Sequence, residues 1–154
     1  MIKKKLAYIL IFFFISSCGY VSIYDNSENF NYIININQTE GDQDINNLYK
    51  DLSNRMKGKN YQNEITIDIK TNYTKTIIGK DLKGSASDYK LLVETEFLLL
   101  SGKENRKIFL AEDFIIKRSG KNFEQQNYEK TVKQNLAKII FQNFLRNLSL
   151  HNDN

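Results

Sequence analysis

Alternating apolar and polar residues predict four strands in this chain, at about residues 30–37, 64–73, 89–100 and 107–117. The second strand has the clearest pattern, because its Ile and Thr residues alternate with charged and polar ones. Apolar steps of three and four predict two helices, at about residues 44–57 and 122–150. Asp44 is suited to cap the first helix, and Lys57 with Gly58 suits its end.

The order of the predicted elements is strand, helix, strand, strand, strand, helix. The first strand–helix–strand unit should make a right-handed crossover between parallel strands, and the next two connections should be hairpins. The fold class predicted is therefore α+β, a two-layer sandwich of one four-stranded mixed sheet with two helices on one face. We expect a single domain over residues 30–150 and a tail at residues 151–154.

The first seventeen residues have the layout of a secretory signal. Lys3, Lys4 and Lys5 precede an apolar run that is too short to cross a membrane, which needs roughly 20 residues. Ile15-Ser16-Ser17-Cys18 then resembles the bacterial lipobox, with Ile15 in place of the usual Leu. In that motif the thiol takes up diacylglycerol and becomes the new N-terminus. We expect a lipoprotein signal peptide at residues 1–17, lipidation of Cys18 and a lipidated tether at residues 18–29.

Removal of the signal peptide changes the charge balance. The whole chain has 22 Lys and Arg residues against 18 Asp and Glu residues, and three of the lysines lie in the signal. The mature chain therefore carries 19 cations against 18 anions, so its overall charge gives no reason to expect a nucleic-acid binder.

The residues needed for common catalytic and metal sites are missing from the sequence. The only histidine is His151, in the tail, and the only cysteine is Cys18. These two residues cannot supply a zinc site of the usual ligands or a His-based catalytic triad. The sequence also has no P-loop and no GxGxxG motif. We expect no enzyme activity, no metal and no cofactor, and a periplasmic hydrolase would lack both nucleophile and base.

The hairpin between the third and fourth strands is apolar on both faces of the sheet. A sheet that helices cover on one side needs only one apolar face. Two explanations remain open: the last helix or the tether covers the second face, or a partner protein buries it. The candidate partner residues are Phe97, Leu98, Leu99, Leu100, Ile108, Phe109 and Leu110.

Basic residues follow the second and fourth strands. Both strands run toward the same end of the sheet, so the loops after them should be neighbours, with Asp81 as the only acid between them. Basic loops are often simply solvated, but five cations together on a nearly neutral protein favour a site for phosphate or carboxylate groups. The candidate ligand-binding residues are Lys80, Lys83, Lys117, Arg118 and Lys121.

Several stretches of the chain resemble one protein family. Gly19-Tyr20 follows the lipobox at once, and residues 88–93 place a Tyr at the start of a strand after a polar loop. Residues 114–145 combine a strand, a turn that bears Phe123, and a helix with an acidic start. With the element order and the small size, these stretches resemble the outer-membrane lipopolysaccharide-assembly lipoproteins (LptE type), particularly their alphaproteobacterial branch. The resemblance spans nearly the whole mature chain and rests on no invariant catalytic motif.

The resemblance implies a non-enzymatic protein that plugs a large β-barrel, helps that barrel fold and contacts lipopolysaccharide on its way to the outer leaflet. It also implies a lipid anchor in the outer membrane, with the domain facing the periplasm or the barrel lumen. Basic residues after strands two and four are linked to lipopolysaccharide binding in the family, and Lys80 with Lys117 or Arg118 are the nearest matches. The alternative is an auxiliary or scaffold lipoprotein of another envelope transport complex.

Overall fold

The computed structural model describes residues 32–57, 63–100, 105–119 and 121–150. The predicted signal peptide, Cys18, the whole tether and the tail with His151 lie outside the described residues. The element order matches the predicted one, and the elements are β1 Tyr32–Gly41, α2 Gln43–Met56, β2 Asn63–Lys80, β3 Ala86–Leu100, β4 Arg106–Lys117 and α3 Asn122–Leu150.

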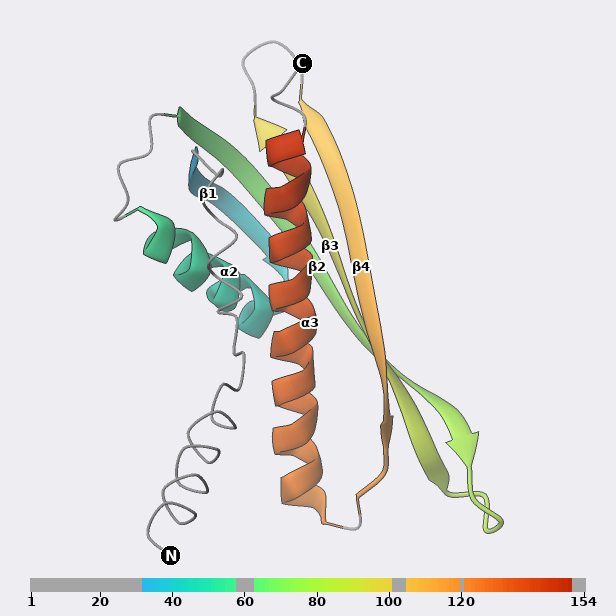
Figure 1. Ribbon diagram of the computed structural model, residues 1–154. Helices are drawn as coiled ribbons and strands as arrows, with labels where there is room; N and C mark the ends of the chain where they lie inside the picture. The colour runs from blue at the N-terminus through green and yellow to red at the C-terminus, as the bar shows by residue number, and fades with distance from the viewer. Residues whose placement is uncertain (1–31, 58–62, 101–104, 120, 151–154) are drawn as a thin grey trace, which may run out of the picture.

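The four strands form one mixed sheet in the order β1-β2-β3-β4. β1 and β2 are parallel, as expected when a helix connects two strands, and the other two pairs are antiparallel. α2 and the long α3 lie on the same face of the sheet, so the molecule has two layers (Figure 1). The structure therefore confirms the predicted α+β class and its element order.

The core lies between the helices and the inner face of the sheet. The rings of Phe97 on β3 and Phe144 on α3 stack with their centroids 4.0 Å apart, and Tyr49 of α2 stacks on Phe141 of α3 at 5.5 Å. The hydroxyl groups of Tyr49 and Thr95 form a buried hydrogen bond of 2.9 Å, which satisfies both polar atoms. These aromatic contacts join both helices to β3 and fix the two layers against each other.

The start of α2 differs from the prediction, because Asp42 caps the helix and Asp44 does not. The Asp42 carboxylate accepts a hydrogen bond from the backbone N–H of Ile45 at 3.1 Å, and its own backbone is extended. Gly41 before it has φ +99, and a Cβ there would lie 1.7 Å from the Thr71 carbonyl oxygen. The tight passage from β1 into the helix therefore requires glycine at position 41.

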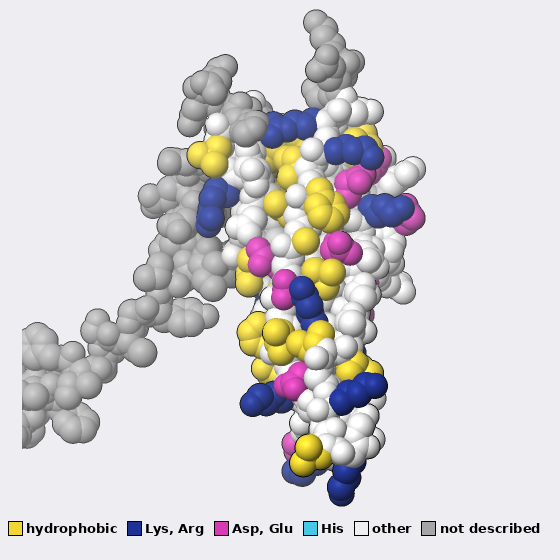
Figure 2. All heavy atoms as spheres, turned by 90° about the vertical axis from the view of Figure 1, so that its right-hand side faces the viewer, with side chains coloured by type: hydrophobic (Ala, Val, Ile, Leu, Met, Phe, Trp, Pro, Cys, Tyr) yellow, Lys and Arg dark blue, Asp and Glu magenta, His cyan; other side chains and the backbone are white. Residues whose placement is uncertain are grey.

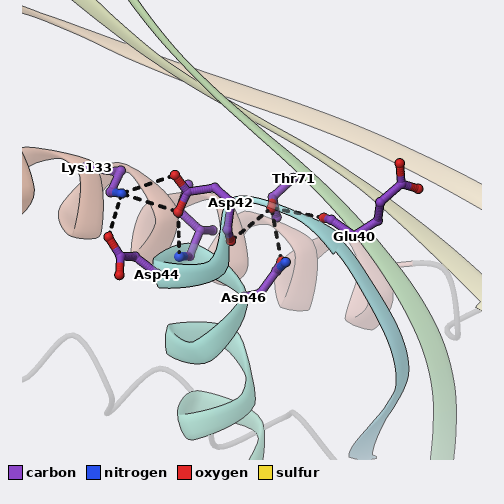
Figure 3. A network of polar contacts seen from close by, with 7 residues as sticks. Glu40, Asp42, Asp44, Asn46, Thr71 and Lys133 are labelled. Atoms are coloured by element: carbon purple, nitrogen blue, oxygen red, sulfur yellow. Dashed lines mark hydrogen bonds and ion pairs between the residues drawn. The ribbon is translucent and has the colours of Figure 1, made fainter.

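Asp44 lies in the first turn of α2 and joins that turn to α3. The Lys133 ammonium of α3 lies 2.8 Å from the Asp44 carboxylate and 3.1 Å from that of Asp42 (Figure 3). The hydrogen bond from Lys133 lowers the pKa of Asp44. Burial lowers the pKa of Lys133, but its hydrogen bonds to Asp44 and Asp42 outweigh burial, so the pKa is raised overall. These ion pairs hold the N-terminus of α2 against the middle of α3.

β2 and β3 extend further than the sequence pattern predicts, and the loop between them is a short turn at residues 81–85. One oxygen of the Asp81 carboxylate accepts hydrogen bonds from the backbone N–H groups of Lys83 and Ser85, both at 2.9 Å. Gly84 supplies the positive φ that the turn requires. The hairpin leaves the two-layer body and projects away from α3, as the light-green arrow in Figure 1 shows.

Candidate functional site

The two basic segments lie side by side at one end of the sheet. Lys117, at the end of β4, is opposite Asp88 in the β3–β4 register. The backbone N–H of Arg118 donates to the Ser87 carbonyl at 2.8 Å, which ties the chain after β4 to the base of the β2–β3 hairpin. We call this part of the molecule, residues 77–88, 114–119 and 121–128, the hairpin end.

The five candidate cations at the hairpin end are all exposed: Lys80, Lys83, Lys117, Arg118 and Lys121. Among the described residues, Lys121 alone of the five has an ion-pair partner, the Glu124 carboxylate at 2.9 Å. The sequence reasoning counted only Asp81 as a nearby acid, because it did not consider that the register brings Asp88 beside Lys117. Four exposed cations therefore remain without an ion-pair partner in the described part of the chain.

The nearby acids are engaged with groups other than these four cations. Asp81 accepts from the turn N–H groups, and Asp88 accepts a hydrogen bond from the Ser87 hydroxyl at 2.7 Å. Glu124 is paired with Lys121. Lysine and arginine donors arranged in this way suit phosphate and carboxylate oxygens, which accept charge-assisted hydrogen bonds.

Exposed apolar side chains at the hairpin end were missed by the sequence reasoning. Ile77 and Ile78 are about half exposed, while Leu82 at the turn and Phe123 at the start of α3 are more exposed still. The signal in the sequence was an apolar pair, Ile77-Ile78, directly before a basic loop. It was missed because the alternation that identifies β2 is clear only as far as Tyr73.

The β3–β4 hairpin divides the predicted partner residues between two faces. Phe97 and Ile108 are buried in the core, and Leu99 and Leu110 pack against it. These four side chains already have partners within the domain, so they offer little surface to another protein. Leu98, Leu100 and Phe109 alternate with them and lie on the opposite face, where Phe109 is largely exposed. The candidate partner surface is therefore reduced to these three residues.

The sheet face that carries Leu98, Leu100 and Phe109 is covered by neither α2 nor α3. Charged cross-strand pairs lie among its apolar residues: Lys107 with Glu96 at 2.7 Å and Lys90 with Asp113 at 3.4 Å. Hydrophobic side chains interleaved with charged ones run down the molecule on the side shown in Figure 2. We call the face that carries Leu98, Leu100, Phe109 and Ile115 the outer sheet face.

The described part of the chain contains neither a cluster of metal ligands nor a helix that could span a membrane. Within residues 32–57, 63–100, 105–119 and 121–150, no three His, Cys, Asp or Glu side chains gather in a way that would hold a metal ion. No helix within the same ranges is both long and apolar enough to span a membrane.

Comparisons with known proteins show where this fold occurs. The sequence matches no protein-family model and no curated protein. Among solved structures, the chain is similar to rare lipoprotein B from Shewanella oneidensis, at 14% identity and a TM-score of 0.52, covering 72% of this chain and 96% of that one. It is also similar to a lipoprotein from Caulobacter crescentus, at 12% identity and a TM-score of 0.52, covering 76% and 88% of the two chains. At these identities the likeness establishes a shared fold, in both cases with a bacterial lipoprotein.

Proposed function

We propose that this chain is an outer-membrane lipoprotein of the LptE type. In this proposal it acts as plug and assembly partner of the lipopolysaccharide-translocating β-barrel and contacts lipopolysaccharide during insertion into the outer leaflet. The observation that carries the proposal is the hairpin end, where four exposed cations that have no ion-pair partner among the described residues occur on the fold of rare lipoprotein B. Lipoproteins of the rare lipoprotein B type form the LptE family.

The proposed role is non-enzymatic. In this proposal a lipid on Cys18 anchors the protein in the outer membrane. Lipopolysaccharide carries phosphates and acidic sugars, and these are the groups that Lys80, Lys117 and Arg118 can bind by charge-assisted hydrogen bonds. The outer sheet face supports the partner half of the proposal, because a face with both exposed apolar side chains and charged pairs resembles a protein interface more than bare solvent-facing sheet.

A charge-reversal variant tests the ligand half of the proposal. Each exposed cation contributes about 0–1 kcal/mol, so single changes are expected to be nearly silent, and three should be changed together. We expect Lys80→Asp, Lys117→Asp, Arg118→Asp in combination to weaken lipopolysaccharide binding on the order of tenfold or more at low salt. Binding by the parent chain should weaken at moderate salt, because exposed charges are screened.

A matched control separates the site from the change in net charge. Lys50, Arg55 and Lys57 of the α2 region are exposed and lie far from the hairpin end along the fold. The combination Lys50→Asp, Arg55→Asp, Lys57→Asp makes the same change in net charge and should leave binding close to that of the parent. If both triple variants bind equally well, or lose binding equally, the hairpin end is not the lipopolysaccharide site.

A further inference from the structure

The tip of the β2–β3 hairpin presents a leucine to solvent. Leu82 has a relative exposure of 108%, the highest among the exposed large hydrophobic side chains of the described surface. Ile77 and Ile78, on the same hairpin, are 52% and 48% exposed. β4 pairs with β3 only from Asp88 onward, so the tip extends beyond the end of β4.

A single exposed leucine needs no explanation, but a cluster of exposed apolar residues does. Ten large hydrophobic side chains are exposed among the described residues, and seven of them lie at the hairpin end. They are Ile77, Ile78, Leu82, Phe114, Ile115, Phe123 and Tyr128. The same part of the molecule carries the four cations that pair with no acid in the described ranges of the chain. Apolar and cationic surface are therefore concentrated together.

The turn holds Leu82 in its exposed position. The Asp81 carboxylate accepts from the N–H groups of Lys83 and Ser85, and the Asp81 backbone N–H donates to the Ser85 carbonyl at 2.8 Å. The Gly84 backbone, at φ +78, closes the same turn with a 2.9 Å hydrogen bond to the Asp81 carbonyl. A turn fixed by four hydrogen bonds presents its leucine outward without a further ordering cost on binding.

Exposed cations lie close to this leucine along the chain. Lys83 follows it directly, and Lys80 precedes it by two residues, with Asp81 between them. Lys117 ends β4, and Arg118 follows it. An apolar tip with lysines close to it is an arrangement that suits the interface of an anionic bilayer, with the apolar group among the acyl chains and the cations at the phosphates. A projecting tip is convex, so it suits entry into a packed lipid layer better than enclosure of one acyl chain.

We propose that the β2–β3 hairpin tip inserts Leu82 into an anionic lipid layer, with Lys80 and Lys83 at the headgroup phosphates. This activity goes beyond the proposed function, because it requires neither the β-barrel nor a lipopolysaccharide-specific contact.

A tryptophan probe tests insertion directly, because the natural chain contains no tryptophan. The mature chain, with Cys18→Ala to prevent acylation, would carry Leu82→Trp, and a control would carry Ile139→Trp on α3. Vesicles of equal parts phosphatidylglycerol and phosphatidylcholine should shift the emission of the Leu82→Trp protein to the blue. Pure phosphatidylcholine vesicles should not, and the Ile139→Trp protein should show no shift with either.

Vesicle sedimentation provides the second measurement. Leu82→Ser should lower the partition coefficient for the anionic vesicles about tenfold, since burial of a leucine side chain is lost. Equal partitioning of Leu82→Ser and the parent would mean electrostatic adsorption only and would overturn the proposal. Equal emission shifts for the two tryptophan positions, or no emission shift at position 82, would overturn it as well. A blue shift in a protein that fails to co-purify with the β-barrel would refute the proposed function alone. Co-purification without a shift would refute insertion alone.

Discussion

Replacing Lys133 by methionine should loosen the attachment of α2 to α3. Methionine keeps most of the length and apolar character of the lysine stem but removes the ammonium group that joins Asp42 and Asp44. The same substitution removes a cation 5.1 Å from the centre of the Tyr73 ring. The Asp42 cap of α2 is retained, so the variant isolates the link between the two helices from the start of α2 itself.

The expected size of the effect follows from burial. The Lys133 side chain is 12% exposed, while the side chains of Asp42 and Asp44 are 19% and 55% exposed. Breaking a fully buried pair costs about 3–5 kcal/mol, and an exposed pair is worth about 0–1 kcal/mol. Lys133 lies between these limits, because one of its two partners is well solvated. We expect Lys133→Met to lower the free energy of unfolding by about 2 kcal/mol.

Urea denaturation of single and double variants measures this link. Asp42→Asn keeps a good capping residue but removes the charge, so the double-mutant cycle with Lys133→Met isolates the ion pair. The coupling energy should be about 1 kcal/mol or more. Lys70→Met is the matched control, since the Lys70–Glu40 pair is exposed at both ends, and it should change stability by less than about 0.5 kcal/mol. A coupling energy near zero, or a Lys70 effect as large as that of Lys133, would refute the reasoning.

Three further outcomes are expected. Tyr49→Phe should cost about 1–2 kcal/mol in urea denaturation, because it leaves the buried Thr95 hydroxyl unpaired, and adding Thr95→Val should recover part of the loss. The pKa of Asp44 is lowered and that of Lys133 is raised, so their stabilisation should hold from about pH 5 to pH 9. The stabilisation should decline as the pH falls below 3.8, through the folded-state pKa of Asp44, and as it rises above 10.5, through that of Lys133. Urea denaturation of the parent and Lys133→Met at several pH values measures this. A difference in the free energy of unfolding that stays the same at every pH would contradict the expectation. Cys18→Ala should yield an unacylated protein that stays as precursor or is released from membranes on fractionation. Normal processing and membrane retention of this variant would rule out the lipobox assignment.

The sequence predicted the elements with strong periodicity and failed where polar side chains decide the structure. Residues 37–41 do not alternate, yet β1 continues through them to Gly41 across a bulge between Ile36 and Gln38. The Asp68 carboxylate stabilises this irregular part, accepting from the Asn37 side chain at 2.8 Å and the Gln38 backbone at 3.0 Å. Such long-range polar contacts leave no periodic signal in the sequence.

The candidate site shows the same limit. Strand directions were enough to predict that the loops after β2 and β4 meet, because that follows from topology alone. Which face of the β3–β4 hairpin is covered could be learned only from the structure, which shows the helices over the face of Phe97 and not over that of Leu98. The position of Leu82 depended on the hydrogen bonds of Asp81, which determine how short the turn is.

Affinity purification from detergent-solubilised outer membranes tests the partner role most directly. The lipidated full-length protein should retain one large β-barrel, identified by mass spectrometry as the lipopolysaccharide translocon. Leu98→Asp on the outer sheet face should reduce the recovered barrel strongly, while Asn54→Asp on the exposed side of α2 should not, provided both variants keep the parent's circular dichroism spectrum. Recovery of a different envelope complex, or of no barrel with the parent protein, would contradict the account.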